Sequence, residues 1–215
     1  MTTFAVVLFG WIFSLCLHEF SHALVAYRGG DWTVREKGYL SFNPLKYTHP
    51  VYSLLLPLLF LVMGGIGLPG GAVYIETWRL RSRQWRTAVA LAGPASNLLL
   101  ALILSLILRF APVNFSGIWP GLAFLALLQV TAVVLNLIPV PPFDGYNAIE
   151  PHMNEATRIQ FEQTRGMFIW IVFLLLWFVP LVANLFWGLI FFISDFMGIP
   201  RTLAAVGLDG FQFWR

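Results

Sequence analysis

The stretch 4–27, FAVVLFGWIFSLCLHEFSHALVAY, decides the fold class of this chain. It is long enough to cross a bilayer, since a transmembrane helix needs about 20 apolar residues. Near its end it carries His18, Glu19 and His22. Ionisable residues are costly inside a membrane and mark functional sites there by default. The stretch therefore predicts a membrane helix that carries a functional site.

The whole chain has the composition of an integral membrane protein. Of its 215 residues, 59% are hydrophobic and 11% are charged, whereas soluble domains carry about 25% charged residues. Further apolar runs cover 51–68, 88–110, 118–138 and 167–193. We expect an all-α polytopic membrane protein, a helical bundle of about four to five membrane segments. It forms a single domain over 1–215, with a core at 4–146 and a C-terminal helix and tail at 167–215.

Positive charges predict how this bundle lies in the membrane. Lys and Arg gather on the cytoplasmic side, and the polar segments 28–50 and 69–87 are both basic. If both are cytoplasmic, the run 51–68 begins and ends on the same side and is re-entrant. Re-entrant backbone is tolerated where it is buried in protein or lines a wet cavity.

A small β element is expected beside the re-entrant segment. The stretch 71–78 is short, β-branched and aromatic, and Pro-Gly-Gly precedes it, which is typical of a strand. Its expected partner is the region 38–42. An unwound substrate segment could add to such a strand by β-augmentation.

His18 and His22 are spaced to bind one metal ion. Residues i and i+4 lie on the same face of a helix, so two imidazoles can hold one Zn²⁺. Glu19, beside the first histidine, can then act as the general base on a metal-bound water. The motif therefore predicts a catalytic zinc site rather than a packing feature of the helix.

One protein ligand is still missing, because a catalytic zinc usually has three together with a water. Asp144 is the favoured third ligand, since it directly follows the run 118–138 after a Pro-rich stretch that ends the helix. His22 and Asp144 can meet only if the two runs end on the same side of the membrane. Glu36, in the polar segment 28–50, remains the alternative ligand, as in a gluzincin.

Three motifs in order resemble the site-2 protease family of intramembrane zinc metalloproteases. They are His-Glu-x-x-His at 18–22, Gly-Pro-Ala-Ser-Asn at 93–97 and Asn-x-x-Pro-x-x-x-x-Asp-Gly at 136–145. The chain is similar to the compact bacterial branch of that family, which has no PDZ or CBS domain. It departs from many relatives at Tyr146, where they have a second glycine after Asp-Gly. That departure leaves the expected metal ligands unaffected.

The resemblance implies a role for each polar residue of the motifs. By it, His18, His22 and Asp144 bind Zn²⁺ and Glu19 is the catalytic base. Asn97 and Asn136 resemble the family's active-site asparagines. They are expected to hydrogen-bond the substrate backbone or the developing oxyanion.

These expectations describe an enzyme that hydrolyses a peptide bond in or near the transmembrane helix of another membrane protein, as in regulated intramembrane proteolysis. Its partners are that substrate and the lipid bilayer, and no basic cluster interleaved with aromatics indicates nucleic acid. It is expected in the bacterial inner membrane with its site towards the cytoplasm. The alternative is a membrane zinc-binding protein or transporter, for which the carboxylate of Glu19 would be unnecessary.

Overall fold

The computed structural model describes residues 1–47, 73–111, 117–212 and 214. Four of its helices are long and apolar enough to cross a membrane: α1 (Thr2–Gly29), α4 (Arg83–Leu108), α5 (Trp119–Asn136) and α9 (Pro180–Met197). Shorter helices join them: α2 (Thr33–Glu36), η1 (Pro44–Lys46), α6 (Asp144–Ile149), η4 (Glu150–His152) and α7 (Glu155–Gln163). The prediction of an all-α polytopic membrane protein is confirmed. The predicted re-entrant segment 51–68 lies outside the described residues.

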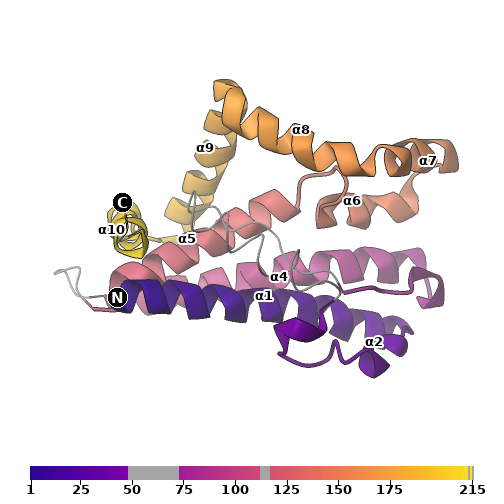
Figure 1. Ribbon diagram of the computed structural model, residues 1–215, viewed down its shortest axis with the longest axis horizontal. Coiled ribbons are helices and arrows are strands. Elements are labelled where there is room, and N and C mark those ends of the chain that lie inside the picture. The colour runs from indigo at the N-terminus through magenta and orange to yellow at the C-terminus, as the bar shows by residue number, and fades with distance from the viewer. Residues whose placement is uncertain (48–72, 112–116, 213, 215) are drawn as a thin grey trace.

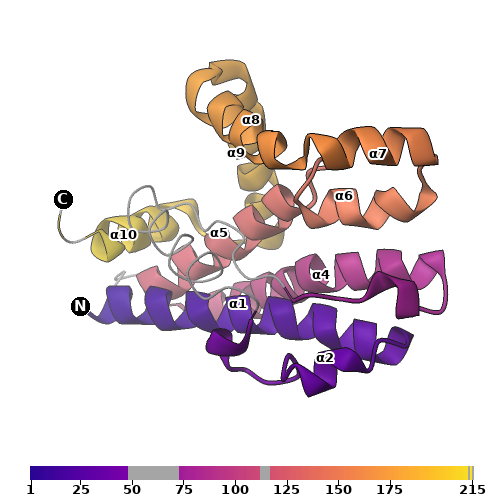
Figure 2. The same ribbon diagram turned by 45° about the vertical axis from the view of Figure 1, so that its right-hand side comes forward.

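The helices α1, α4 and α5 lie side by side and form the central bundle (Figure 1, Figure 2). Apolar side chains from all three are buried in their shared core, among them Val7, Leu104 and Leu128. Gly10 of α1 lies against Leu125 of α5 so closely that a Cβ atom there would overlap the leucine side chain. Close approach of the helices therefore depends on a small residue at this contact.

The end of α1 and the start of α4 lie at the same end of this bundle. The backbone N–H of Arg81 donates to the carbonyl of Gly29 at 3.0 Å. Gly30 follows α1 with φ of 121°, and a Cβ there would stand 2.8 Å from the carbonyl oxygen of Arg79. Glycine permits both that backbone conformation and that approach. The residues that directly follow α1 therefore contact those that directly precede α4.

No strand occurs among the described residues, so the β element expected at 71–78 is wrong for the part of it that the structure describes. Residues 73–76 have no regular secondary structure, and Thr77–Arg79 form the short 3-10 helix η3. A side chain binds this backbone where a neighbouring strand was expected. The carboxylate of Asp31 accepts a hydrogen bond from the N–H of Glu76 at 2.7 Å.

The run 167–193, predicted as a single C-terminal helix, is divided between two helices. α8 (Arg165–Phe178) and α9 meet at a sharp bend (Figure 1). Pro180 begins α9, and Val179 before it has φ of −111° and ψ of 98°. A proline lacks the N–H that would continue the helix and disfavours helical backbone at the residue before it.

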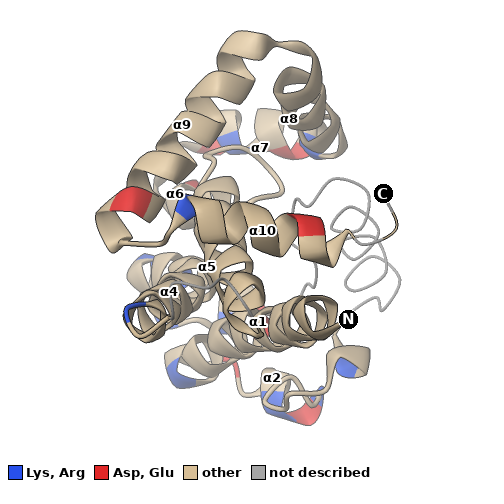
Figure 3. Cartoon of the chain, turned by 90° about the vertical axis from the view of Figure 1, so that its left-hand side faces the viewer, with Lys and Arg blue, Asp and Glu red and all other residues tan. Residues whose placement is uncertain are grey.

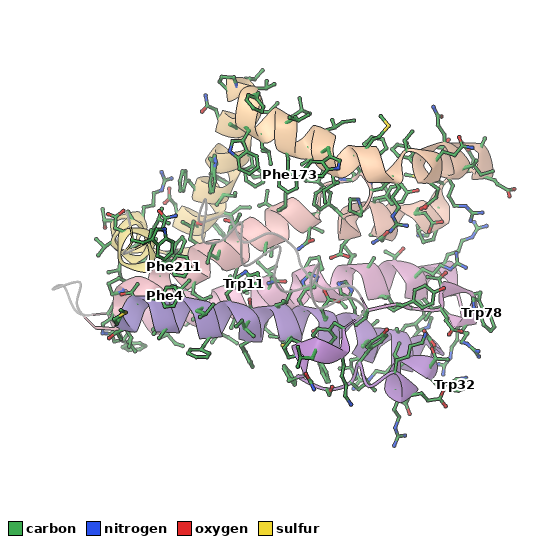
Figure 4. The ribbon with its side chains drawn as sticks, viewed as in Figure 1. Phe4, Trp11, Trp32, Trp78, Phe173 and Phe211 are labelled. Carbon is green, nitrogen blue, oxygen red and sulfur yellow. The ribbon has the colours of Figure 1, made fainter. Side chains whose placement is uncertain are left out.

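The tail forms a further helix, α10 (Arg201–Phe211), which lies across the other end of the bundle (Figure 3). Phe211 is fully buried and stacks on Phe4 of α1 with ring centroids 5.3 Å apart (Figure 4). Gly207 lies against α5, where a Cβ would overlap the backbone carbonyl of Pro120. The tail is therefore a packed part of the helical bundle.

Candidate metal and catalytic site

His18 and His22, in the C-terminal half of α1, meet Asp144 of α6. The Nε2 atoms of the two histidines are 3.0 Å apart. Oδ2 of Asp144 lies 3.2 Å from Nε2 of His18 and 3.4 Å from Nε2 of His22. Ligands of a tetrahedral zinc with bonds of about 2.0–2.1 Å stand roughly 3.3 Å apart. The three donor atoms therefore have the spacing that one zinc ion requires.

The second nitrogen of each imidazole is held by an oxygen on α4. Nδ1 of His18 lies 2.5 Å from Oδ1 of Asn97, and Nδ1 of His22 lies 2.6 Å from the carbonyl oxygen of Val89. Both oxygens accept hydrogen bonds, so each Nδ1 carries its proton and each Nε2 is free to bind a metal. Outer hydrogen bonds of this kind fix the orientation of metal-binding histidines.

One face of α4 shapes the space around the two rings. Val89, Gly93 and Asn97 follow each other at intervals of four residues, which places them on the same face of the helix. A Cβ atom at Gly93 would overlap Nε2 of both His18 and His22. Position 93 must therefore be glycine. Val89 and Asn97, one turn before and one turn after it, hold the two imidazole rings by hydrogen bonds.

Gln129 of α5 was not singled out from the sequence, although it contributes to the site. The side-chain nitrogen of Asn97 donates to Oε1 of Gln129 at 2.7 Å, and Gln129 is 1% exposed. This bond orients the amide of Asn97 so that its oxygen faces His18. The signal in the sequence was an amide side chain in the middle of the apolar run 118–138, whose other amide, Asn136, lies near the end of the run.

Asp144 reaches the histidines because the chain folds back sharply after α5. It is the first residue of α6, and Phe143 before it is extended and 2% exposed. A Cβ atom at Gly145 would overlap the carbonyl oxygen of Leu137. Glycine beside the carboxylate therefore permits the backbone contact that brings Asp144 back towards α1.

Glu19 is buried, with 3% of its surface exposed, and lines the same cavity as the three donors. The cavity has a volume of about 640 Å³. Oε2 of Glu19 accepts a hydrogen bond from the N–H of Val73 at 3.1 Å. The residues Val73, Tyr74 and Ile75 form part of the cavity wall. The carboxylate of Glu19, the three clustered donor atoms and a stretch of irregular backbone thus line the same cavity.

The remaining polar residues named from the sequence occupy three different places. Asn136 lines the cavity. Asn97 lies behind His18, with its side-chain oxygen and nitrogen both engaged. Glu36 is exposed on α2, and it is not part of the metal-ligand cluster formed by the described residues. The geometry therefore favours Asp144 over Glu36 as the third ligand.

Comparisons with known proteins agree with this geometry. Residues 4–115 match the model of peptidase family M50. The chain is 47% identical to Rip2 of Mycolicibacterium smegmatis, over 98% of this chain and 81% of that protein. It is 31% identical to YwhC of Bacillus subtilis, over 83% of each protein, and both relatives carry the name of a zinc metalloprotease. No solved structure matches the chain. The chain therefore belongs to peptidase family M50, the site-2 protease family that its three motifs resemble.

Proposed function

We propose that this protein is an intramembrane zinc endopeptidase in which His18, His22 and Asp144 hold the metal and Glu19 is the general base. The observation that carries the proposal is the triangle of donor atoms, with sides of 3.0 to 3.4 Å, beside a buried carboxylate in one cavity. When bound, zinc would lower the pKa of its water to about 7 and polarise the carbonyl group of the substrate.

The protein's own groups then act on the substrate in turn. Glu19 takes the proton of the attacking water and returns it to the leaving amine. Its Oε2 atom is held by the N–H of Val73, which leaves Oε1 for the proton. Asn136, on the cavity wall, binds the substrate backbone or the oxyanion. Asn97 has its amide engaged behind His18, so we assign it to holding that ring.

The single domain 1–215 would lie in a bacterial cytoplasmic membrane with its site towards the cytoplasm. The last turn of α1, the first turn of α4 and the described residues between these helices carry most of the positive charge of the described chain: Arg28, Arg35, Lys37, Lys46, Arg79, Arg81, Arg83 and Arg86. Positive charge beside membrane helices favours the cytoplasmic side. The substrate would be the transmembrane segment of another membrane protein, unwound locally so that its carbonyls become accessible.

The test compares purified wild type with Glu19→Gln, Asp144→Asn and Glu36→Gln in vesicles. Zinc content and cleavage of a model transmembrane substrate are measured for each protein. We expect Glu19→Gln to keep about one zinc and lose cleavage, because the base acts after the metal is bound. Asp144→Asn should lose both, and Glu36→Gln should lose neither.

Two other outcomes would redirect the proposal. A wild type that binds zinc without cleaving, and that Glu19→Gln leaves unchanged, is a zinc-binding protein or a transporter. Loss of zinc in Glu36→Gln with retention in Asp144→Asn would restore the gluzincin-type site.

A further inference from the structure

The cavity beside the metal site contains charged side chains that the proposed reaction does not use. Its walls include residues of α1, α4, α6, α7 and α8. Of these helices, α6 lies beside the first half of α4 (Figure 2). Besides Glu19 and Asp144, the charged residues that line the cavity are Arg86, Glu150, Glu162 and Arg165. Their ion pairs decide which of these charges is available to a substrate.

Three of the four charges are paired within the protein. Oε1 of Glu150 lies 3.7 Å from Nη1 of Arg158, and Oε2 of Glu162 lies 3.3 Å from Nη1 of Arg165. The described residues include every Asp and Glu of the chain, and none of them has a side-chain carboxylate within ion-pair distance of Arg86. In the part of the chain that the structure describes, Arg86 is therefore the unpaired charge of the cavity wall.

Arg86 faces the cavity from the same side of α4 that touches the metal site. It stands seven positions before Gly93, where an added Cβ would overlap both histidine rings. Two turns of a helix take about seven residues, so the two residues share one face. Val89 and Ala90, between them, line the cavity as well. At a rise of about 1.5 Å a residue, Arg86 starts about 10 Å from Gly93 along the helix axis.

The guanidinium of Arg86 is oriented but keeps free donors. Its Nε atom donates to the carbonyl oxygen of Thr77 at 3.2 Å, and Thr77 also lines the cavity. Its two Nη atoms bond to no described residue. The side chain is half-buried, and a desolvated charge is costly unless it is paired and hydrogen-bonded. A guanidinium binds a carboxylate through two parallel hydrogen bonds, so an acidic side chain from outside the chain would complete this residue.

The charge balance of the cavity also favours an acidic ligand. A bound Zn²⁺ would carry two positive charges, which offset the carboxylates of Glu19 and Asp144. The ion pairs of α6 and α7 add no net charge. The remaining charge is that of Arg86. In a partly enclosed cavity such a charge attracts an acidic side chain and repels a basic one more strongly than it would in water.

We propose that Arg86 is a specificity-determining residue that binds an acidic side chain of the substrate. An extended peptide advances about 3.3 Å a residue, so an offset of about 10 Å along α4 corresponds to about three residues. The acidic residue then stands about three residues from the cleaved bond, towards the end of the bundle where α4 begins. This inference rests on the proposed function. It names the substrate class, which is a membrane segment with Asp or Glu close to its cleavage site on the proposed cytoplasmic side.

The test measures preference between substrates that differ in one side chain. A model transmembrane substrate carries Glu, Gln or Lys at each position about two to four residues from the cleaved bond, which mass spectrometry of the products locates. Full-length wild type, Arg86→Met and Arg86→Glu are assayed in vesicles. The matched control is Arg83→Met. Arg83 is also in the first turn of α4, but it is exposed and is not among the residues that line the cavity.

Wild type and Arg83→Met should cleave the Glu substrate with kcat/KM about tenfold above that of the Gln substrate, the scale of a hydrogen bond to a charged group. Arg86→Met should cleave the two equally. Arg86→Glu should prefer the Lys substrate to the Glu substrate. Each preference is a ratio within one protein, so partial misfolding of a variant cannot produce it.

Binding is measured separately in Glu19→Gln, which should bind the substrate without cleaving it. Its Kd for the Glu substrate should be about tenfold below that for the Gln substrate, and adding Arg86→Met should make the two equal.

The two proposals fail in different ways. A wild type that cleaves none of the substrates overturns the proposed function. Equal cleavage of the Glu and Gln substrates at every position by an active wild type overturns only the role of Arg86. Equal Kd values in Glu19→Gln, or a preference that persists in Arg86→Met, would do the same.

Discussion

The side-chain oxygen of Asn97 lies 2.5 Å from Nδ1 of His18, and the side-chain nitrogen of the same asparagine donates to Gln129 at 2.7 Å. This buried connection runs from the metal site on α1 through α4 to α5. If the side-chain amide of Asn97 were flipped, its NH2 group would face the proton on Nδ1 of His18. The hydrogen bond to Gln129 therefore keeps the amide oxygen of Asn97 directed at His18. Three helices thereby determine the direction of Nε2 of His18, one of the proposed metal-binding atoms.

Replacing Asn97 by leucine should weaken zinc binding without removing a ligand. Loss of a hydrogen bond to a metal-bound histidine lowers metal affinity by about 10- to 100-fold. Cleavage by Asn97→Leu should therefore fall at limiting zinc and recover with excess zinc. A chelator competition measures the affinity. Ser105→Ala, which removes a buried hydroxyl from the same helix and its bond to Met197, is the control and should bind zinc as wild type does.

Replacing Gly93 by alanine should disrupt the site through crowding. The added Cβ would overlap both Nε2 atoms of His18 and His22, and overpacking costs about 1–3 kcal/mol. We expect Gly93→Ala to lose zinc and cleavage, as measured by metal analysis and by the vesicle assay. Gly188→Ala on α9 meets no atom within 4 Å, so it should keep both. Wild-type zinc content in Gly93→Ala would contradict the geometry.

The packing of α10 can be tested by stability alone. A side chain at Gly207 would overlap the backbone of Pro120, so Gly207→Ala should lower the free energy of unfolding by about 1–3 kcal/mol. Thermal unfolding in detergent measures this change. Gly166→Ala, whose added methyl meets nothing within 4 Å, is the matched control. Zinc content should be the same in both, and equal unfolding temperatures would show that α10 is not packed as described.

Metal removal should destabilise the protein, because the proposed zinc ligands come from two distant parts of the chain. A ligand that binds only the folded state stabilises it by about 4 kcal/mol at a thousand times its Kd. Adding zinc to the chelator-treated wild type should therefore raise its unfolding temperature. The same addition to Asp144→Asn should change it little. An equal response of the two proteins would exclude Asp144 as a ligand.

The metal triangle could be predicted because most of it is local. The spacing of His18 and His22 is fixed by helix geometry. Asp144 could be predicted as the third ligand because it directly follows the run 118–138, which is expected to end on the same side of the membrane as the run 4–27. The contact between Asn97 and Gln129 could not be predicted in this way. Which faces of α4 and α5 meet depends on how the helices rotate and cross, and a sequence of apolar runs does not specify that.

The segment 73–76 shows why propensity alone was insufficient. Its β-branched and aromatic residues predicted a strand, but such propensity mainly measures fit to a half-buried surface. Its backbone is bound by Asp31 and Lys37, whose contribution is visible only in three dimensions. The division of the run 167–193 was accessible from the sequence, because Pro180 stands in its middle.

The contact of α4 with the two histidine rings makes metal binding depend on how two membrane helices cross. Val89, Gly93 and Asn97 touch rings that belong to α1, so a change of tilt between the helices changes the angles available to the metal. Bilayers thicker or thinner than the apolar length of a helix alter that tilt. Membrane thickness, through the crossing of α1 and α4, would then act on the zinc affinity of the proposed site.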